Sequence, residues 1–251
     1  MFHIETGNNI FAGTKIAPPN IDFMIVFTMD TDWACDEILE YALAVFQEYN
    51  MAITLFMTNK TGARINEKHE IAIHPNFVSL EFEKHIAERL DDFPDAKGCR
   101  SHSLFFTERF RPIFAKYKIE YQSNSMMYKQ VGINPFYISP TTIEIPLYWM
   151  DNFCIEMEGE YPAYRVDQLN LESPGLKVIN FHPIHLFLNT ASMNEYADAK
   201  KYYHEPEKLV KHRNVKHKGS KDYLVEILEY VKNKNLPTSR MIDVNNNYRN
   251  N

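Results

Sequence analysis

Apolar and polar positions along this chain recur in two periods, one typical of buried strands and one typical of amphipathic helices. Phe23 to Met29 is an apolar run that predicts a buried strand. The segment 36–50 then has acidic residues in its first turn and the spacing of a helix. Its apolar face is made of Ile38, Ala42, Val45, Phe46 and Tyr49. A second apolar run, AITLFM, follows at once, so the order predicts a β-α-β unit with parallel strands and a right-handed crossover.

The same alternation continues less regularly to the end of the chain. Further strands are expected within HEIAIHPNF (69–77), as a short strand that ends at His74, and at GCRSHSLF (98–105), Ile119–Gln122, Phe136–Ser139, IEIPLYW (143–149) and LKVINF (176–181). Helices are expected near Glu81–Leu90, at ERFRPIFAKY (108–117) and at SKDYLVEILEYVKNKN (220–235), with residues 151–175 mostly loop or short helix. After a polar N-terminal arm over residues 1–20, no linker or repeat divides the chain. We therefore expect a single α/β domain, either barrel-like or an open parallel sheet.

Polar residues gather where the predicted strands end. The first strand runs into Asp30 and Asp32, which share a face if the chain stays extended, because residues two apart do so. Carboxylates held that close repel each other, so a cation or a proton is needed nearby. Three later strands deliver further groups of the same kind, namely His74, Arg100 with His102, and His182 with His185. Chemistry in α/β folds lies at the carboxyl ends of strands, and aspartate with imidazole suits Zn²⁺ or a similar divalent ion.

Composition narrows the class of protein. The formal net charge of −6 argues against a general nucleic-acid binder, and the basic stretch LVKHRNVKHKGSK reads as an ordinary solvated segment. No apolar run approaches the ~20 residues that a bilayer span needs. The N-terminus lacks the pattern of a signal peptide, and Cys35, Cys99 and Cys154 are too scattered for a metal motif. These features predict a cytoplasmic protein with reduced thiols.

Taken in order, these residues resemble the polysaccharide deacetylases, the NodB-type carbohydrate esterases of family 4. In that family the first motif is a strand that ends in paired aspartates, as FTMDTD does here. The second motif begins at a strand that ends in a metal-binding histidine, as HEIAIH does. A third motif contains an arginine, matched by Arg100, and the last is a strand ending in a histidine, as in VINFHP. The resemblance covers roughly Phe23 to His185. It implies a distorted (β/α)7 barrel and hydrolysis of an acyl amide on a sugar.

This sequence departs from the family pattern at two places. A second metal histidine usually follows the first by four residues, but Val78 occupies that position. His102, at the end of the next predicted strand, is the nearest replacement. Thr31 also separates the two aspartates, which leaves the division of tasks between them less defined.

The resemblance implies a role for each residue. Asp32, His74 and His102 are expected to hold a divalent metal, with Zn first and Mn, Fe or Co as alternatives. Asp30 is expected to act as general base with Arg100 fixing its carboxylate, and His182 to protonate the leaving amine. Trp149 and His185 are expected on the substrate side, although a Trp at a strand end is often core and His185 can equally pack behind His182.

Other functions stay open at this point. The same barrel serves hydrolases of non-sugar C–N bonds, and a non-catalytic carbohydrate-binding barrel would fit the missing histidine at Val78. For an enzyme without a signal peptide, the expected substrate is an intracellular precursor of a surface polysaccharide. The sugar, the acyl group and the oligomeric state are not determined by the sequence.

Overall fold

The apolar runs of the sequence form the strands of one curled sheet. The computed structural model describes residues 23–250, so the arm expected at 1–20 lies outside the described residues. The strands are β1 (Phe23–Asp30), β2 (Thr54–Met57), β3 (Glu70–Ile73), β4 (Gly98–Cys99), β5 (Tyr121–Gln122), β6 (Phe136–Ser139), β7 (Thr142–Glu144), β8 (Trp149–Met150), β9 (Gly175–Phe181) and β10 (Thr238–Ser239). Their order is β6-β7-β5-β4-β3-β2-β1-β9-β8, with β10 beside β1, and among these pairs only β6 and β7 run antiparallel.

The run 142–150 connects the two sides of the curled sheet. Its first half pairs with β5, and the amide of Leu147 still donates to the Ser125 carbonyl. Its second half pairs with β9, beginning with the Tyr148 amide on the Val178 carbonyl. The predicted strand IEIPLYW is therefore two short strands, since Pro146 lacks an amide proton and interrupts the ladder. The sheet becomes the distorted barrel that the sequence predicted.

Side chains of the barrel strands alternate between two cores. On β1, Ile25, Phe27 and Met29 face outward into the cluster under α1 and α8, whereas Val26 faces the cluster inside the barrel. Thr28 and Asp30 continue the inward column from Val26. The inside of the barrel is thus apolar in its middle and polar where the strands end.

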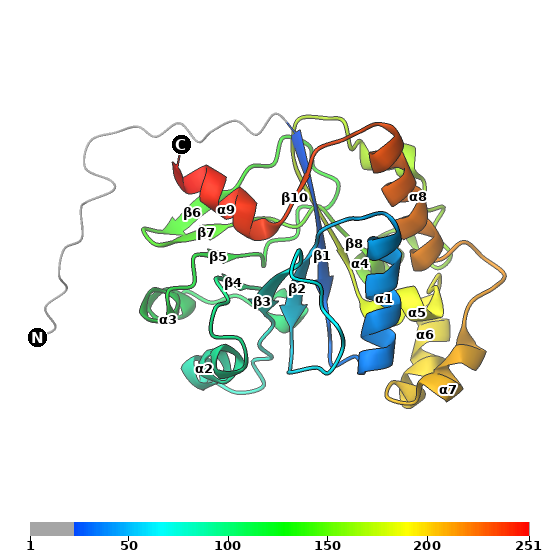
Figure 1. The fold of residues 1–251 in the computed structure, drawn as a ribbon, viewed down its shortest axis with the longest axis horizontal. Helices are drawn as coiled ribbons and strands as arrows, with labels where there is room; N and C mark the ends of the chain where they lie inside the picture. Colours follow the sequence, from blue (N-terminus) through cyan, green and yellow to red (C-terminus); the bar gives the residue numbers. More distant parts are fainter. Residues whose placement is uncertain (1–22, 251) are drawn as a thin grey trace, which may run out of the picture.

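Helices cover the outside of the sheet and one end of the barrel. They are α1 (Asp36–Glu48), α2 (Phe82–Asp92), α3 (Phe110–Tyr117), α4 (Asp151–Glu158), α5 (Pro183–Leu188), α6 (Met193–Ala199), α7 (Pro206–Leu209), α8 (Ser220–Asn233) and α9 (Met241–Asn250). Short 3₁₀ turns are η1 (His102–Leu104), η2 (Val166–Leu169), η3 (Lys200–Tyr202) and η4 (Val210–His212). In Figure 1, α1 and α8 lie on one side of the strands and α2 and α3 on the other. Among residues 23–250, none of the helices combines the length and apolar character that a bilayer span requires.

Two expectations from the sequence need correction. GCRSHSLF is not a full strand: β4 ends at Cys99, and His102 begins η1, in which Ser103 has a left-handed backbone with φ of 58°. The polar C-terminal segment forms α9, which the sequence pattern did not predict. Met241 and Val244 of α9 pack into the cluster inside the barrel.

Candidate active site

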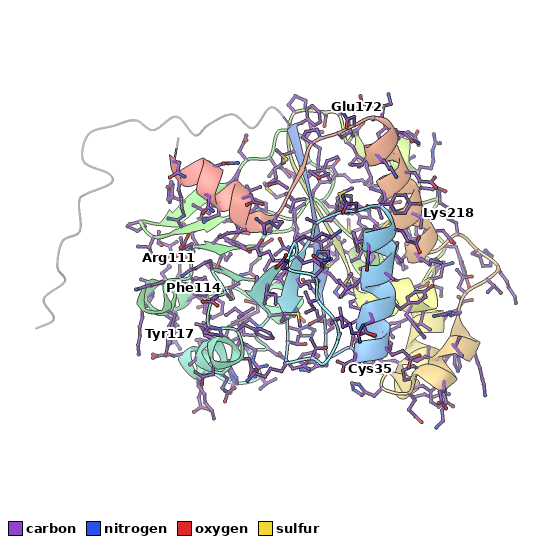
Figure 2. The ribbon with its side chains drawn as sticks, in the orientation of Figure 1. Cys35, Arg111, Phe114, Tyr117, Glu172 and Lys218 are labelled. Carbon is purple, nitrogen blue, oxygen red and sulfur yellow. The ribbon has the colours of Figure 1, made fainter. Side chains whose placement is uncertain are left out.

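The polar strand ends predicted from the sequence meet at one end of the barrel. Asp30, His74, Arg100 and His182 lie at or just beyond the carboxyl ends of β1, β3, β4 and β9, and all four are buried. Figure 2 marks this end of the molecule with Cys35, which precedes α1. Parallel strands bring these side chains together because their carboxyl ends share one edge.

Asp30 is held by a buried arginine. Arg100 Nη1 donates to Asp30 Oδ1 at 2.8 Å, and Asn180 Nδ2 donates to the other carboxylate oxygen at 3.0 Å. The guanidinium is fully buried, donates to Ser123 and lies 4.0 Å above the ring of Phe56. Its positive charge compensates the negative charge of the Asp30 carboxylate, and both groups are shielded from water. These contacts hold the Asp30 carboxylate in one orientation, with Oδ2 3.9 Å from His182 Nε2.

Asp32 reaches the site through a turn rather than an extended strand. β1 ends at Asp30, and Asp32 and Trp33 have left-handed backbones with φ of 43° and 58°. This conformation costs roughly 1–2 kcal/mol per non-glycine residue, so other contacts must hold it. The Trp33 amide donates to Thr58 Oγ1 at 2.8 Å, and the Tyr203 hydroxyl donates to the Asp32 carbonyl at 2.6 Å. The expectation that both aspartates share the face of one extended strand is therefore wrong. Asp30 ends β1, and Asp32 reaches the same site through the turn that follows.

Asp32, His74 and His102 form a compact group of potential metal ligands. Asp32 Oδ1 lies 3.2 Å from His74 Nε2 and 3.2 Å from His102 Nδ1. His74 Nδ1 lies 2.7 Å from the carbonyl oxygen of Arg100, which can only accept. That nitrogen therefore carries a proton, and Nε2 is the ring nitrogen that faces Asp32.

Hydrogen bonds and charges within this group shift the pKa values of its members. Burial raises the pKa of Asp32, but hydrogen bonds from His102 and His74 and the charge of His182 hold it well below its ordinary value. The hydrogen bond to Asp32 raises the pKa of His102. Val78, at the usual family position of the second histidine, is 77% exposed. His102 lies beside Asp32 instead.

The donor set fits a divalent metal. The three ligand atoms lie within 4.8 Å of one another and come from one carboxylate and two imidazoles. Such a set suits Zn²⁺ and other first-row divalent ions, and three protein ligands leave positions for water and substrate.

His182 faces both aspartates and is oriented by a third. Its Nε2 lies 3.9 Å from Asp30 Oδ2 and 3.7 Å from Asp32 Oδ2. Its Nδ1 lies 2.7 Å from Asp151 Oδ1, and its amide donates to Asp151 Oδ2 at 2.8 Å. Burial disfavours the charged imidazole, but the charge and hydrogen bond of Asp151, followed by Asp32 and Asp30, raise the pKa of His182 to about 10. These carboxylates therefore favour the protonated form of the imidazole, whose Nε2 faces Asp30 and Asp32.

The structure corrects the two expected substrate residues. Trp149 is fully buried and packs against Phe181 and Tyr223, so no face of its ring is open to a sugar. His185 is buried behind His182 with ring centroids 5.5 Å apart, and burial lowers its pKa to about 4. His185 packs against His182, whereas Asp151 is the residue that orients the His182 ring.

Asp151 and Asn180 were not predicted as site residues from the sequence, although the position of each relative to a strand indicated it. Asp151 follows β8 directly, so it is one more carboxylate at a strand end. Asn180 lies two residues before His182 on β9 and therefore shares its face. Besides Asp30, its amide group also contacts Arg100 and Thr28.

A barrel of parallel strands with a carboxylate–histidine site at their carboxyl ends is the architecture of the NodB-like deacetylases. Residues 27–200 match the family described as WbmS-like polysaccharide deacetylase. This chain belongs to that family. A search of curated proteins finds no match.

Solved structures agree with this assignment. The chain is similar to a protein of Bordetella bronchiseptica described as a polysaccharide deacetylase involved in O-antigen biosynthesis, with 26% identity and a TM-score of 0.74. That match covers 82% of this chain and 90% of the other. A structure described as a polysaccharide deacetylase from Mycobacterium smegmatis shares the fold, with 15% identity, a TM-score of 0.55 and 92% of each chain covered.

Proposed function

We propose that this protein is a metal-dependent hydrolase that removes an N-acetyl or related acyl group from a carbohydrate. One observation supports this most directly. The buried Asp30 and the half-buried Asp32 have different partners and face the same histidine, beside a group of potential metal ligands. A base, an acid and a metal position within one cleft are what amide hydrolysis requires.

Asp32, His74 and His102 would hold the metal. When bound, a divalent ion lowers the pKa of a water molecule towards neutrality and polarises the acyl oxygen. The first-row ions Zn, Mn, Fe and Co all accept oxygen and imidazole ligands, with Zn the first choice for this set.

Asp30 would accept the proton of the attacking water. Arg100 and Asn180 each occupy one side of its carboxylate, so the oxygens cannot rotate away from the cleft. A base held in place needs no reorganisation when the proton moves.

His182 would donate a proton to the departing amine. An amine is a poor leaving group unless it is protonated as the C–N bond breaks. Asp151 holds Nδ1, so the proton on Nε2 points towards Asp30 and Asp32, between which the substrate amide would lie. The buried carboxylate of Asp151 also stabilises the charged imidazole.

We propose a sugar of a surface polysaccharide, or its intracellular precursor, as the substrate. The similarity to the protein described as involved in O-antigen biosynthesis supports this choice. A cytoplasmic location stays a prediction from the sequence.

The test combines metal content with hydrolysis. Purified protein is assayed for bound metal and for release of acetate from N-acetylated sugars, with cyclic amides as the rival substrates. We expect Asp32→Ala and His74→Ala to lose the metal and the activity together. Asp30→Asn should keep the metal and lose about 10²–10⁴ in kcat, the range of general-base catalysis.

Three outcomes would contradict the proposal. Absence of stoichiometric metal that neither ligand variant alters would remove the metal role. Full activity of Asp30→Asn would remove the base assignment. Tight sugar binding with no hydrolysis in the metal-loaded protein would favour the non-catalytic carbohydrate-binding barrel, and selective turnover of cyclic amides would favour a non-sugar amidase.

A further inference from the structure

A cavity of about 550 Å³ opens beside the candidate metal ligands. Asp32 and His102 form its inner wall, and its outer wall comes from the segment between α6 and α7. The cavity is therefore continuous with two of the candidate metal ligands, and a substrate held there can extend into it. Its lining then limits which carbohydrate the site accepts.

Aromatic rings line the inner part of the cavity. Trp33 is 39% exposed, and its ring lies edge-to-face on His102 with centroids 5.1 Å apart. Tyr203, whose hydroxyl donates a hydrogen bond to the Asp32 carbonyl, also lines the cavity. Flat aromatic faces beside a reactive centre are suited to the apolar face of a sugar ring. Trp33, unlike the fully buried Trp149, has an exposed ring at this cavity.

Two lysines at the outer wall have uncompensated charge. Lys200 and Lys201 are exposed, and neither forms an ion pair with a carboxylate of residues 23–250. The ammonium of Lys201 lies 5.2 Å above the ring of Tyr202. Of the two carboxylates that flank them in the sequence, Asp198 forms no ion pair with either lysine, and Glu205 is paired with Lys208. The outer wall therefore presents two lysine charges without an ion-pair partner in the described part of the chain, in a protein whose formal net charge is −6.

We infer that this cavity binds the anionic group of a charged sugar, either the carboxylate of a uronic acid or the phosphate of a sugar phosphate. This inference rests on the proposed function, because the acyl group is placed at the metal ligands. The sugar ring then packs between Trp33 and Tyr203, and its anionic group meets Lys200 and Lys201. Opposite charges at a partly desolvated wall contribute to affinity and to discrimination against neutral sugars.

Binding of matched probes to the intact protein tests this inference. The probes are methyl N-acetylglucosaminide, the corresponding N-acetylglucosaminuronic acid glycoside and N-acetylglucosamine 1-phosphate. Isothermal titration calorimetry measures Kd without any need for hydrolysis. We expect at least one anionic probe to bind about tenfold more tightly than the neutral one at low salt, and this preference to shrink as salt rises.

A matched pair of double variants isolates the two lysines. Lys200→Gln with Lys201→Gln should abolish the anionic preference and leave the Kd of the neutral probe unchanged. The control, Lys232→Gln with Lys234→Gln, removes the same charge around the far end of α8 and should keep the preference (Figure 1). Tighter binding of only the uronate or only the phosphate would support the inference and identify the source of the negative charge.

Other results would overturn it. Equal affinity of the wild type for neutral and anionic probes would do so, as would a preference that survives in the lysine variant or disappears in the control. Acetate release, measured on the same probes, separates this inference from the proposed function. Hydrolysis without an anionic preference would contradict only the inference, whereas an anionic preference without hydrolysis would contradict only the proposed function.

Discussion

At the scale of single residues, the partners of a side chain decide what the same functional group can do. Asp30 and Asp32 are separated by one residue, yet their carboxylates have different neighbours. Asp30 is bonded to a guanidinium and an amide, which bind no metal and leave a carboxylate free to accept a proton. Asp32 is bonded to two imidazoles, each of which offers a ligand atom. The proposed base and the proposed ligand follow from these contacts.

Asp151→Asn tests whether His182 protonates the leaving group. The amide oxygen can still accept from the His182 backbone, but the buried charge that stabilises the imidazolium is gone. We expect kcat/KM for an N-acetylated sugar to fall by about 10²–10⁴. The loss on 4-nitrophenyl acetate should be far smaller, because nitrophenolate leaves without a proton.

The comparison of these two substrates distinguishes acid catalysis from a structural role. Asp167→Asn, on exposed η2, is the matched control and should leave both rates unchanged. Equal losses on the amide and the activated ester would show that Asp151 supports only the fold or the metal.

At the scale of elements, one buried carboxylate joins strands to the last helix. Glu70 at the start of β3 accepts from Thr54 Oγ1 at 2.7 Å and from the Ile242 amide at 2.9 Å, and the Tyr121 hydroxyl donates to its other oxygen. The Ile242 contact satisfies an amide in the first turn of α9, which has no partner within the helix. β2, β3, β5 and α9 are thereby linked at the end of the barrel opposite the site.

Glu70→Gln should weaken this junction. We expect the free energy of unfolding to fall by about 1.5–3 kcal/mol, the range for hydrogen bonds to a charged group, as measured by chemical denaturation. Amide hydrogen exchange should increase first in α9. Glu67→Gln, at an exposed position, should change neither quantity, and a loss of stability without faster exchange in α9 would contradict the proposed link.

The same junction shows what the sequence could and could not predict. β1, α1 and β2 were predicted because each has a local apolar period, and α8 for the same reason. α9, with the sequence MIDVNNNYRN, has few apolar residues and depends on Glu70, 172 positions away. Its helix is a consequence of tertiary contacts that no local pattern shows.

In the site, sequence order predicted which strand ends would meet but not the conformation between them. His74, Arg100 and His182 follow from the alternation of strands and helices. The position of Asp32 depends on a left-handed turn held by Thr58 and Tyr203, which lie far along the chain. The choice between Trp33 and Trp149 depends on burial, and only packing decides that.

At the scale of the whole molecule, burial divides the barrel into a stable apolar middle and a polar functional end. Stability and activity can therefore be changed separately. His69 directly precedes β3 and lies away from the polar functional end. It is buried, and its Nδ1 accepts a hydrogen bond from the Ile53 amide at 3.2 Å. That hydrogen bond requires a neutral ring nitrogen. Burial, with a smaller effect of Lys68, lowers the pKa of His69 to about 4.

This lowered pKa predicts a specific loss of stability in acid. Between the ordinary value of 6.5 and about 4, the unfolded chain binds a proton that the folded protein does not. The contribution of His69 to the free energy of unfolding is therefore complete above pH 6.5. It decreases as the pH falls, by about 1.4 kcal/mol per pH unit at the steepest. His69→Asn keeps an acceptor for Ile53 without this titration, so its free energy of unfolding should fall less steeply between pH 6.5 and 4. His217→Asn, at an exposed position, should follow the wild type. Parallel curves for the wild type and His69→Asn in denaturant titrations would show that His69 does not set this slope, because the titrating ring of residue 69 is present only in the wild type.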